Sequence, residues 1–507
     1  MLPADICQRA LGARDARFDG IFFVGITTTK VYCRPVCPSR DAVPAHRRFF
    51  ESAAAAEHAG FRPCLRCRPE LAPGRAVIDA VPRLAQAAAQ RIGAGALNRQ
   101  GVEVLARELG VSGRHLRRAL QRAIGVSPLE LAQTHRLLLA KRLLADTDLP
   151  VTRIAFASGF QSLRRFHAAF RERYRLNPTA LRPPNQRGTP ADDVVRLTLA
   201  YRAPLAWGAL VACLARDALP GVEVASGGRY ARILRLAGQA GVIAVTDGGP
   251  SGNGDRARGP HLEVALSPSL VPALMPLIAR LRHVFDLDAE PRVIDAHLAQ
   301  AGLAELVRRR PGLRIPGAVD GFEAVLRALL ATRALRRRVV RALGEPIDVA
   351  LPGLTHCAPT AERVAAAGGA RLAALGVSPR RAAAIALLAR AMADGRLRLD
   401  PGTDVEAARR ALLEVADVGE PLATAIVAPA LYWPDAFPAS SRSLRRAAAA
   451  SSADDLSGRA DRWRPWRAYA ALHLTLHHEE SRDPDSPGSH RRRGAGARPV
   501  LGTGPHG

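Results

Sequence analysis

Four of the seven cysteines in this 507-residue chain stand in two short pairs, Cys33 with Cys37 and Cys64 with Cys67. Thiolates three or four residues apart can bind one ion from a single turn. Two such turns supply the tetrahedral four-sulfur set that Zn²⁺ prefers. The spacing therefore predicts a zinc centre, and a small core around it that needs the metal to fold.

The spacing fits a structural zinc and also a reactive one. A four-thiolate site carries a formal charge of about −2, so its sulfurs keep nucleophilic character at neutral pH although zinc holds them deprotonated. An exposed sulfur could then attack an electrophilic methyl group. Spacing alone leaves both alternatives open.

The formal net charge of +27 favours a polyanionic partner, with nucleic acid as the first candidate. Coding bias is the alternative cause, because Ala and Arg abound throughout and Lys30 and Lys141 are the only lysines. No apolar run reaches the roughly 20 residues that span a bilayer. The first residues also lack the pattern of a secretory signal. We therefore expect a cytoplasmic, nucleoid-associated protein with reduced thiols and no membrane partner.

Residues 18–33 carry β-branched and aromatic runs broken by glycine, which predicts short strands that deliver Cys33 at a strand end. Ser52 to Ala59 predicts a short helix, and Gly60 to Pro63 turns the chain back toward Cys64. These features predict a small zinc-bound α/β module over about residues 1–80.

The stretch from Asp19 to Glu70 closely resembles the N-terminal zinc domain of the Ada family of bacterial alkylation-response proteins. The resemblance rests on Tyr32-Cys33-Arg34-Pro35-Val36-Cys37 and Gly60-Phe61-Arg62-Pro63-Cys64-Leu65-Arg66-Cys67. It implies Zn²⁺ held by Cys33, Cys37, Cys64 and Cys67, with Cys33 irreversibly accepting a methyl group from a methylphosphotriester in DNA. It also implies that Thr29, Arg40 and Arg62 lie against the DNA backbone. Methylation would make Cys33 a neutral thioether, so the site would lose one negative charge and bind DNA more tightly.

Helical periodicity begins at Val102 and ends near Leu109, where Gly110 breaks the helix. Ser112 is the expected N-cap of a second, basic helix that runs to Ile124. Helix, glycine turn and basic helix predict a helix-turn-helix unit. The pattern recurs over Val151–Ala157 and Ser162–Tyr174, with Leu129–Leu144 as an amphipathic connector. If the two second helices lie about 34 Å apart, both can enter successive major grooves.

The exposed faces of the two second helices carry the residues that we expect to contact DNA: Arg114, His115, Arg117, Arg118, Gln161, Ser162, Arg164 and Arg165. For any one arginine, a solvated face or a phosphate contact is the alternative to base reading. Gly101 to Arg182 is similar to AraC-type regulators, notably Ile154-Ala155-Phe156-Ala157-Ser158-Gly159-Phe160 and Asn177-Pro178. The similarity implies a double helix-turn-helix domain over residues 82–182, a transcription activator and RNA polymerase as a partner.

Composition marks residues 183–192 as a linker and residues 481–507 as a disordered tail. Alternating segments from Val194 to Leu266, with a helix near Trp207 to Arg216, predict an α+β domain over residues 193–305. Pro250 to Pro260 is expected to form a loose turn. Residues 306–480 predict an all-α domain.

Residues 193–480 resemble AlkA, a DNA 3-methyladenine glycosylase of the helix-hairpin-helix superfamily. The resemblance rests on Arg314-Ile315-Pro316-Gly317-Ala318-Val319-Asp320-Gly321-Phe322-Glu323, Leu412-Leu413-Glu414-Val415-Ala416-Asp417-Val418-Gly419 and Trp463-Arg464-Pro465-Trp466-Arg467-Ala468-Tyr469-Ala470. It implies base flipping and cleavage of the glycosidic bond. It also implies that the hairpin around Gly419 holds a DNA phosphate through backbone N–H groups.

Three positions depart from the glycosylase pattern. Asp417 replaces the first glycine of the hairpin, and Leu330-Ala331-Thr332-Arg333 replaces a Gly-Gln-Gln run. Ser441 stands where the family has its catalytic aspartate, with Asp435 six residues away. A serine cannot supply the negative charge that an oxocarbenium-like transition state needs, and such a loss costs on the order of 10²-fold in rate. No lysine follows Lys141, which excludes Schiff-base lyase chemistry.

The sequence thus predicts a multidomain, mainly α protein with α+β parts. Its modules are a zinc-bound α/β module, an all-α domain with two helix-turn-helix units, an α+β sheet domain and an all-α helix-hairpin-helix domain. The predicted function is the sensing and repair of alkylated double-stranded DNA, combined with activation of repair genes. The alternative is an AraC-family transcription factor with a structural zinc and a binding-only C-terminal half.

Overall fold

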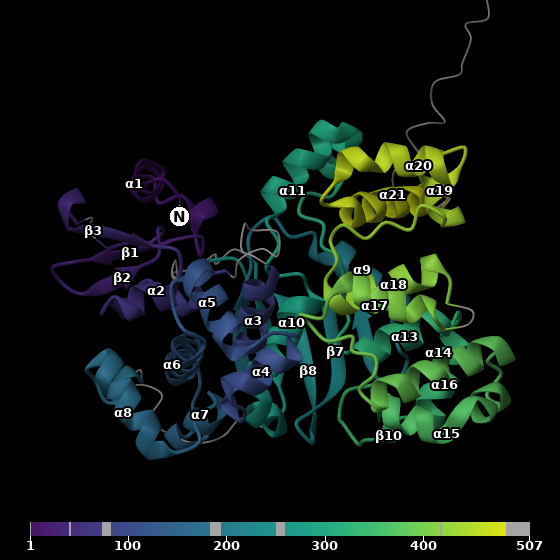
Figure 1. Ribbon diagram of the computed structural model, residues 1–507, viewed down its shortest axis with the longest axis horizontal. Coiled ribbons are helices and arrows are strands. Elements are labelled where there is room, and N and C mark those ends of the chain that lie inside the picture. Colours follow the sequence, from purple (N-terminus) through teal and green to yellow (C-terminus); the bar gives the residue numbers. More distant parts are fainter. Residues whose placement is uncertain are drawn as a thin grey trace, which may run out of the picture.

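The computed structural model describes residues 2–39, 42–73, 83–182, 194–249, 259–415 and 418–482. It confirms a multidomain, mainly α-helical fold with a four-stranded and a five-stranded sheet (Figure 1). The predicted linker, Arg40, Asp417, most of the predicted turn at 250–260 and residues 483–507 of the predicted tail fall outside the described residues. Ser481 and Arg482, predicted as the start of a disordered tail, instead end a helix. None of the helices in the described part of the chain combines the length and apolar character needed to cross a lipid bilayer.

The N-terminal module is a small sheet with strand order β3-β1-β2-β4, flanked by two helices. Its elements are α1 (Ala4–Gly12), β1 (Phe23–Ile26), β2 (Val31–Cys33), β3 (Arg47–Phe50), α2 (Ala53–His58) and β4 (Arg62–Pro63). Gly25 is required in β1, since a Cβ there would stand 2.7–2.8 Å from the rings of Phe50 and Phe61. As predicted, β2 ends at Cys33.

Two helix-turn-helix units follow as the periodicity predicts. The helices are α3 (Arg83–Gly93), α4 (Val102–Glu108), α5 (Gly113–Ile124), α6 (Pro128–Asp146), α7 (Val151–Ala157) and α8 (Leu163–Tyr174). Gly110 turns between α4 and α5 with a φ of +71°, and the Ser112 side chain caps α5 by accepting a hydrogen bond from the His115 N–H. The sequence signals for turn and cap are therefore confirmed.

The connector helix α6 differs from the expected amphipathic rod. Its buried residues occupy several faces and include the charged Lys141 and Arg142. The reason is tertiary, because α2 of the zinc module packs on α6 from one side while α3 and α7 pack on others. A helix with neighbours on several sides has no continuous polar face, and the sequence pattern could not show those neighbours.

The second half opens with an antiparallel sheet in the order β5-β9-β8-β7-β6, at the segments predicted as strands. The strands are β5 (Val195–Ala200), β6 (Glu223–Ser226), β7 (Arg229–Leu236), β8 (Gln239–Asp247) and β9 (His261–Leu266). Two helices, α9 (Trp207–Asp217) and α10 (Leu274–Val284), share a core with this sheet. The α+β architecture is as predicted.

The remaining helices form two groups with separate cores. One core lies among α13 (Gly321–Leu329), α14 (Arg333–Leu343), α15 (Ala361–Ala374), α16 (Pro379–Ala393), α17 (Val405–Leu413) and α18 (Glu420–Leu431). The other joins α11 (Pro291–Leu298) and α12 (Ala304–Arg309) to α19 (Arg442–Ala447), α20 (Ala453–Ala460) and α21 (Arg467–Arg482) (Figure 1). A two-stranded ribbon pairs β10 (Glu345–Pro346) with β11 (His356–Cys357). Helices on both sides of residue 305 therefore pack together, and the domain boundary there stays a prediction.

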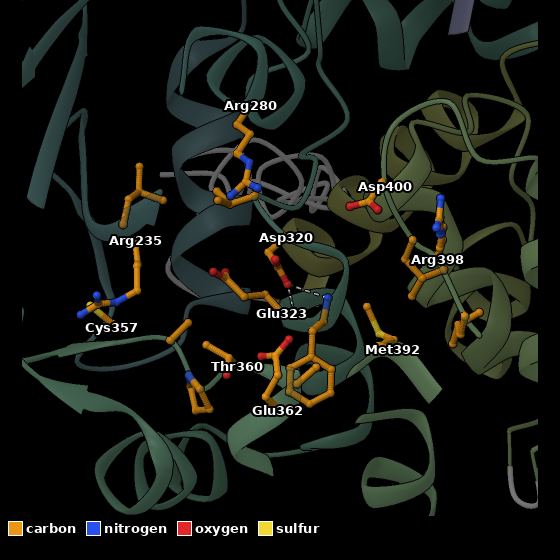
Figure 2. A pocket seen from close by; sticks show the side chains of 18 of the residues that line it. Arg235, Arg280, Asp320, Glu323, Cys357, Thr360, Glu362, Met392, Arg398 and Asp400 are labelled. Atoms are coloured by element: carbon orange, nitrogen blue, oxygen red, sulfur yellow. Dashed lines mark hydrogen bonds between the residues drawn. The ribbon is translucent and has the colours of Figure 1, made fainter. Parts of the chain in front are cut away.

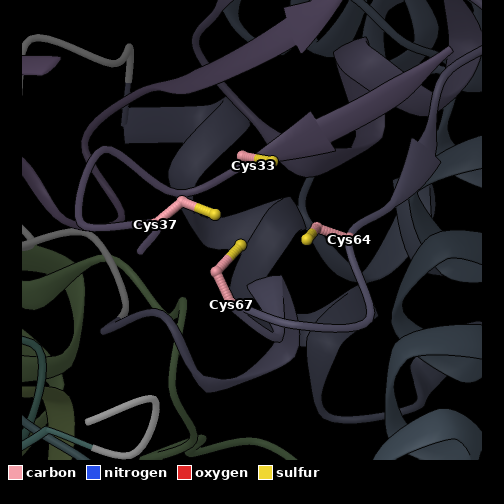
Figure 3. Close-up of side chains that lie close together, drawn as sticks. All are labelled: Cys33, Cys37, Cys64 and Cys67. Carbon is pink, nitrogen blue, oxygen red and sulfur yellow. The ribbon is translucent and has the colours of Figure 1, made fainter. Parts of the chain in front are cut away.

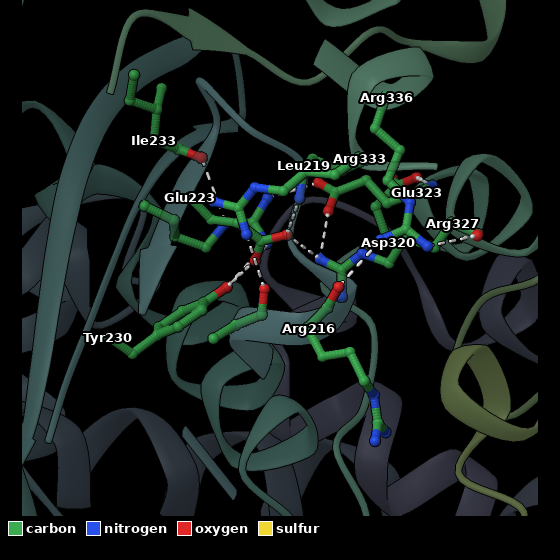
Figure 4. A network of polar contacts seen from close by, with 12 residues as sticks. Arg216, Leu219, Glu223, Tyr230, Ile233, Asp320, Glu323, Arg327, Arg333 and Arg336 are labelled. Atoms are coloured by element: carbon green, nitrogen blue, oxygen red, sulfur yellow. Dashed lines mark hydrogen bonds and ion pairs between the residues drawn. The ribbon is translucent and has the colours of Figure 1, made fainter. Parts of the chain in front are cut away.

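Buried ion pairs fix α13 on the sheet (Figure 4). Arg232 of β7 donates to Glu323 at 2.6 Å, and Arg327 donates to Glu223 at 2.7 Å. Tyr230 completes the network by donating to Glu223 at 2.6 Å. Because buried charges are costly unless paired, each member holds its partner in place, and the network specifies one orientation of α13 against the sheet.

The helix-turn-helix units do not stand apart from the second half. One continuous hydrophobic core contains Leu137 of α6, Ile154 of α7 and Phe166 of α8 together with Val264 of β9 and Leu277 of α10. Beside this core, the Asn98 amide donates to Met275 Sδ at 3.2 Å. Helices α6, α7 and α8 and the sheet domain are thus joined by packing.

Candidate metal centre and DNA-binding surfaces

The structure brings the four predicted zinc ligands together. Their Sγ atoms all lie within 4.8 Å of one another, and Figure 3 shows the four side chains converging on a common centre. β2 ends at Cys33, and β4 runs parallel to it, with the Cys64 N–H donating to the Tyr32 carbonyl at 2.9 Å. This strand pair brings ligands 31 residues apart in sequence to one site.

The four sulfurs have different surroundings. The Arg34 N–H donates to Cys67 Sγ and the Arg66 N–H donates to Cys64 Sγ, both at 3.4 Å. Hydrogen bonding with Cys33 and, to a smaller extent, with Ser39 lowers the pKa of Cys37. Among the described residues no backbone N–H or hydroxyl donates to Cys33 Sγ. Cys33 is also the most exposed of the four, at 9%, whereas Cys67 is 1% exposed.

The thiols are close enough to share protons. A hydrogen bond with Cys33 lowers the pKa of Cys64 and of Cys37, while hydrogen bonds with the other thiols raise the pKa of Cys33. Four thiolates this close repel one another unless a cation lies between them. The donor set and its spacing therefore fit a soft divalent ion such as Zn²⁺.

The zinc module is tied to the helix-turn-helix units by a buried carboxylate. Glu57 of α2 accepts hydrogen bonds from Tyr32 OH at 3.0 Å, Thr134 Oγ1 of α6 at 2.8 Å and Arg173 Nη1 of α8 at 2.8 Å. Burial raises the pKa of Glu57, and the nearby Arg173 guanidinium opposes that shift. Tyr32, the residue before Cys33, is thereby connected to α8.

A second set of polar contacts joins α6 to the segment that carries Cys64 and Cys67. Lys141 of α6 donates to the Cys64 carbonyl at 3.2 Å and pairs with Glu70 at 2.5 Å. Arg68, next to Cys67, pairs with Asp146 at the end of α6 at 2.8 Å. Helix α6 therefore contacts the segment of Cys64 and Cys67 directly, and it reaches the residue before Cys33 through Glu57.

Two of the three residues expected against the DNA backbone are described. Thr29 is exposed in the turn between β1 and β2. Arg62 is half-buried on β4, where its N–H donates to the Lys30 carbonyl at 2.8 Å. They lie at the same end of the small sheet. Arg40 falls outside the described residues.

The two second helices expose most of the predicted DNA-contacting residues. Exposed side chains are those of Arg114, His115, Arg117 and Arg118 of α5, and of Gln161, Arg164 and Arg165 at α8. Arg117 also pairs with Glu103 at 2.8 Å. Ser162 has a structural task, since its hydroxyl caps α8 by accepting from the Arg165 N–H. The contacts of these residues with DNA stay predictions.

Ser441 lies at the start of α19, where its hydroxyl caps the helix by accepting from the Leu444 N–H. Gly419 is the N-cap residue of α18. Asp435, the carboxylate near Ser441 in sequence, is bound by Arg464 at 2.6 Å and by Arg467 at 2.7 Å. Its charge is therefore paired with two arginines.

A cavity of about 530 Å³ lies elsewhere, between α3, β7 and the starts of α13 and α15. Figure 2 shows carboxylates and guanidinium groups of both signs around it, among them Arg280, Asp320, Glu362 and Arg398. None of the candidate site residues named from the sequence lines this cavity, although Asp320, Phe322 and Glu323 of the glycosylase-like motif do. It is a polar gap between modules and is separate from the position of Ser441.

Comparison with known proteins assigns these modules to families. The metal binding domain of Ada matches residues 6–70, a helix-turn-helix domain matches residues 105–183 and the AlkA N-terminal domain matches residues 196–320. A probable bifunctional transcriptional activator/DNA repair enzyme AlkA of Mycobacterium tuberculosis (strain ATCC 25618 / H37Rv) is 38% identical over 496 residues. The match covers 94% of this chain and 97% of that protein. The chain belongs to this AlkA family.

Two further relatives match parts of the AlkA-family chain. DNA-3-methyladenine glycosylase 2 of Escherichia coli (strain K12) is 32% identical over 285 residues, covering 55% of this chain and 95% of that protein. The NMR structure of the E. coli Ada protein in complex with DNA is 31% identical, covering 26% of this chain and 93% of that one with a TM-score of 0.13. This AlkA-family protein thus joins an Ada-type zinc domain to an AraC-type DNA-binding unit and a glycosylase-like half, and its four clustered cysteines bind Zn²⁺.

Sequence reasoning missed a buried carboxylate in the glycosylase-like half of this AlkA-family chain. Asp286 is 1% exposed and accepts hydrogen bonds from Tyr432 OH, from Tyr469 OH at 2.6 Å and from the Ile315 N–H at 3.3 Å. Burial raises the pKa of Asp286 to about 6, although the nearby Arg314 guanidinium opposes the shift. Its partners lie 29 to 183 residues away, so no local motif marks it.

The raised pKa of Asp286 predicts that acidification stabilises this half. The folded state binds the proton more tightly than the unfolded chain, whose reference pKa is 3.8. The free energy of unfolding should therefore rise by about 1 kcal/mol from pH 7 to pH 5 through this group. Urea unfolding followed by tryptophan fluorescence in excess zinc measures it. Asp286→Asn should lose that rise and Asp348→Asn, at an exposed site, should keep it. Equal pH dependence in all three proteins would contradict the assignment.

Proposed function

We propose that this protein senses and repairs alkylated DNA, with Cys33 accepting a methyl group from a methylphosphotriester. The observation that carries the proposal is the contrast between Cys33 and the other three sulfurs. A hydrogen bond to a thiolate stabilises its charge and lowers its nucleophilicity. Cys33 lacks such a donor among the described residues, and as a residue it is 9% exposed, against 7% for Cys37 and Cys64 and 1% for Cys67.

The proposed transfer balances without an added acid or base. A lone pair of the Cys33 sulfur forms the S–CH₃ bond as the C–O bond of the triester breaks. The phosphodiester leaves with the electron pair and its restored negative charge. Bound zinc supplies a thiolate at neutral pH. The product is a thioether, so each protein molecule reacts once.

Methylation is proposed to act as a switch. The cluster loses one negative charge beside the DNA phosphates, so affinity for duplex DNA should rise. Thr29, Arg40 and Arg62 are proposed to lie against the backbone. α5 and α8 are proposed to read the operator through Arg114, His115, Arg117, Arg118, Gln161, Ser162, Arg164 and Arg165. RNA polymerase is the proposed partner in activation.

The glycosylase-like half is proposed to bind damaged duplex without efficient base excision. At the start of α18 the Gly419 and Glu420 N–H groups are proposed to face a phosphate, whereas Pro421 has no N–H and the Leu422 N–H donates to the Gly419 carbonyl at 3.0 Å. Ser441 carries no charge, and the two arginines on Asp435 remove the nearby alternative. Binding without cleavage is the function that these groups support.

The test is to incubate zinc-loaded protein with a duplex that carries methylphosphotriesters and 3-methyladenine. Peptide mass mapping should find one added methyl group on Cys33, and abasic sites should stay at background. Methylated protein should bind unmodified duplex several-fold more tightly at low salt, because one opposing charge is gone. Absence of methyl on Cys33 in the zinc-loaded protein would leave the structural-zinc transcription factor as the function.

A further inference from the structure

We infer that the buried pair Arg34–Asp19 selects which sulfur accepts the methyl group. This inference rests on the proposed methyl transfer to Cys33. Arg34 directly follows Cys33, and both members of the pair are almost fully buried, at 4% and 5% exposed. Arg34 Nε donates to the Asp19 carboxylate at 2.8 Å, and Nη2 forms a second contact with it.

The Arg34 side chain also reaches the other cysteine pair. Its Nη1 donates to the Cys67 carbonyl at 3.1 Å. One guanidinium group therefore connects Asp19, which precedes the sheet, to the second arm of the metal site. Because guanidinium is planar and its donors are fixed, contacts with both partners set its position more tightly than a point charge would.

The consequence falls on the Arg34 backbone. With the side chain held at Asp19 and Cys67, the Arg34 N–H is directed at Cys67 Sγ, at 3.4 Å. That hydrogen bond stabilises the Cys67 thiolate and lowers its nucleophilicity. The same residue is covalently next to Cys33, whose sulfur receives no N–H from the described residues. Arg34 is thus a positioning residue that lowers the nucleophilicity of the Cys67 sulfur, and the Cys33 sulfur remains the reactive one.

Arg66 provides a matched control. Its N–H also donates to a ligand sulfur, that of Cys64 at 3.4 Å, but its side chain is exposed. Replacing the Arg66 side chain keeps the N–H···S bond and removes no buried side-chain contact. If only the Arg34 substitution has an effect, the cause is the loss of the buried contacts of its side chain with Asp19 and Cys67. A general change in charge near the cluster would affect both variants.

The test compares full-length, zinc-loaded wild type with Arg34→Lys, Asp19→Asn and Arg66→Lys. Methyl iodide is the first probe, since it needs no DNA contact, and peptide mass mapping reports the methyl content of each cysteine. Wild type and Arg66→Lys should label Cys33 and spare Cys67. Arg34→Lys and Asp19→Asn should bind one zinc per chain as before, yet increase labelling of Cys67 relative to Cys33 about tenfold, because the N–H···S bond is no longer held. Transfer from a methylphosphotriester duplex to Cys33 should slow by about tenfold in the same variants.

A measurement on the unmutated protein guards against variants that fail to fold. In ¹¹³Cd-substituted wild type, the Arg34 amide proton should show a scalar coupling to the metal through the Cys67 sulfur. Unchanged cysteine selectivity in zinc-loaded Arg34→Lys and Asp19→Asn, or absence of that coupling, would overturn the inference. If wild type transfers no methyl from the triester to Cys33 at all, the proposed function fails instead.

Discussion

Removal of zinc is expected to unfold the N-terminal module while the rest of the chain stays folded. The strands of this module are only two to four residues long, and the four cysteines with Leu11 and Val24 form one of its cores. A core this small cannot offset the conformational entropy of ordering the segment. Zinc binding in small structural sites contributes on the order of 10 kcal/mol of folding free energy.

Hydrogen exchange with mass spectrometry measures the effect. After treatment with a chelator and a reductant, backbone amides of β1 and β2 should lose protection on the order of 10³-fold, whereas amides of α13 and α16 should keep theirs. Cys64→Ser should reproduce the loss. Cys213→Ser, at a buried cysteine of α9 outside the cluster, should not. Full protection of β1 in the metal-free protein would show that the sheet does not depend on the ion.

Ser441→Asp is expected to restore base excision. Serine and aspartate both cap helices well, so the substitution should leave α19 intact. The new carboxylate would place a negative charge at the position that the resemblance to the glycosylase family assigns to the catalytic aspartate. Stabilising an oxocarbenium-like transition state in this way should raise the release of 3-methyladenine by about 10²-fold over wild type.

Release of the free base from an alkylated duplex, scored together with abasic sites, measures the gain. Ser440→Asp is the matched control, because it adds the same charge one residue earlier at an exposed position. It should remain at the wild-type level. If wild type already releases 3-methyladenine well above Ser441→Ala, the serine protein is a working glycosylase and the binding-only proposal is wrong.

Local signals account for what could be predicted from the sequence. The cysteine spacings gave the metal centre, since each pair closes on an ion from one turn. Gly110 and Ser112 marked the first helix-turn-helix, because a positive φ and an N-cap are properties of single residues. The strands of the five-stranded sheet were also found, from their apolar runs between turns.

Contacts between residues far apart in sequence account for what was missed. The burial of α6 depends on other helices that pack against it, and the hydrophobic periodicity of its own sequence does not show them. Glu57 meets Arg173 across 116 residues, and Arg34 meets Cys67 across 33. A carboxylate or an arginine in such a place looks in the sequence like any surface charge. Only the fold shows that it is buried and paired.

The hydrophobic core that α6, α7 and α8 share with the five-stranded sheet has a consequence for how this protein can be dissected. Two domains that are joined only by a flexible linker can be separated without exposing the core of either one. Here the removal of either part would expose apolar surface of the other part to solvent. Cutting the chain between α8 and β5 is therefore expected to lower the stability of both pieces.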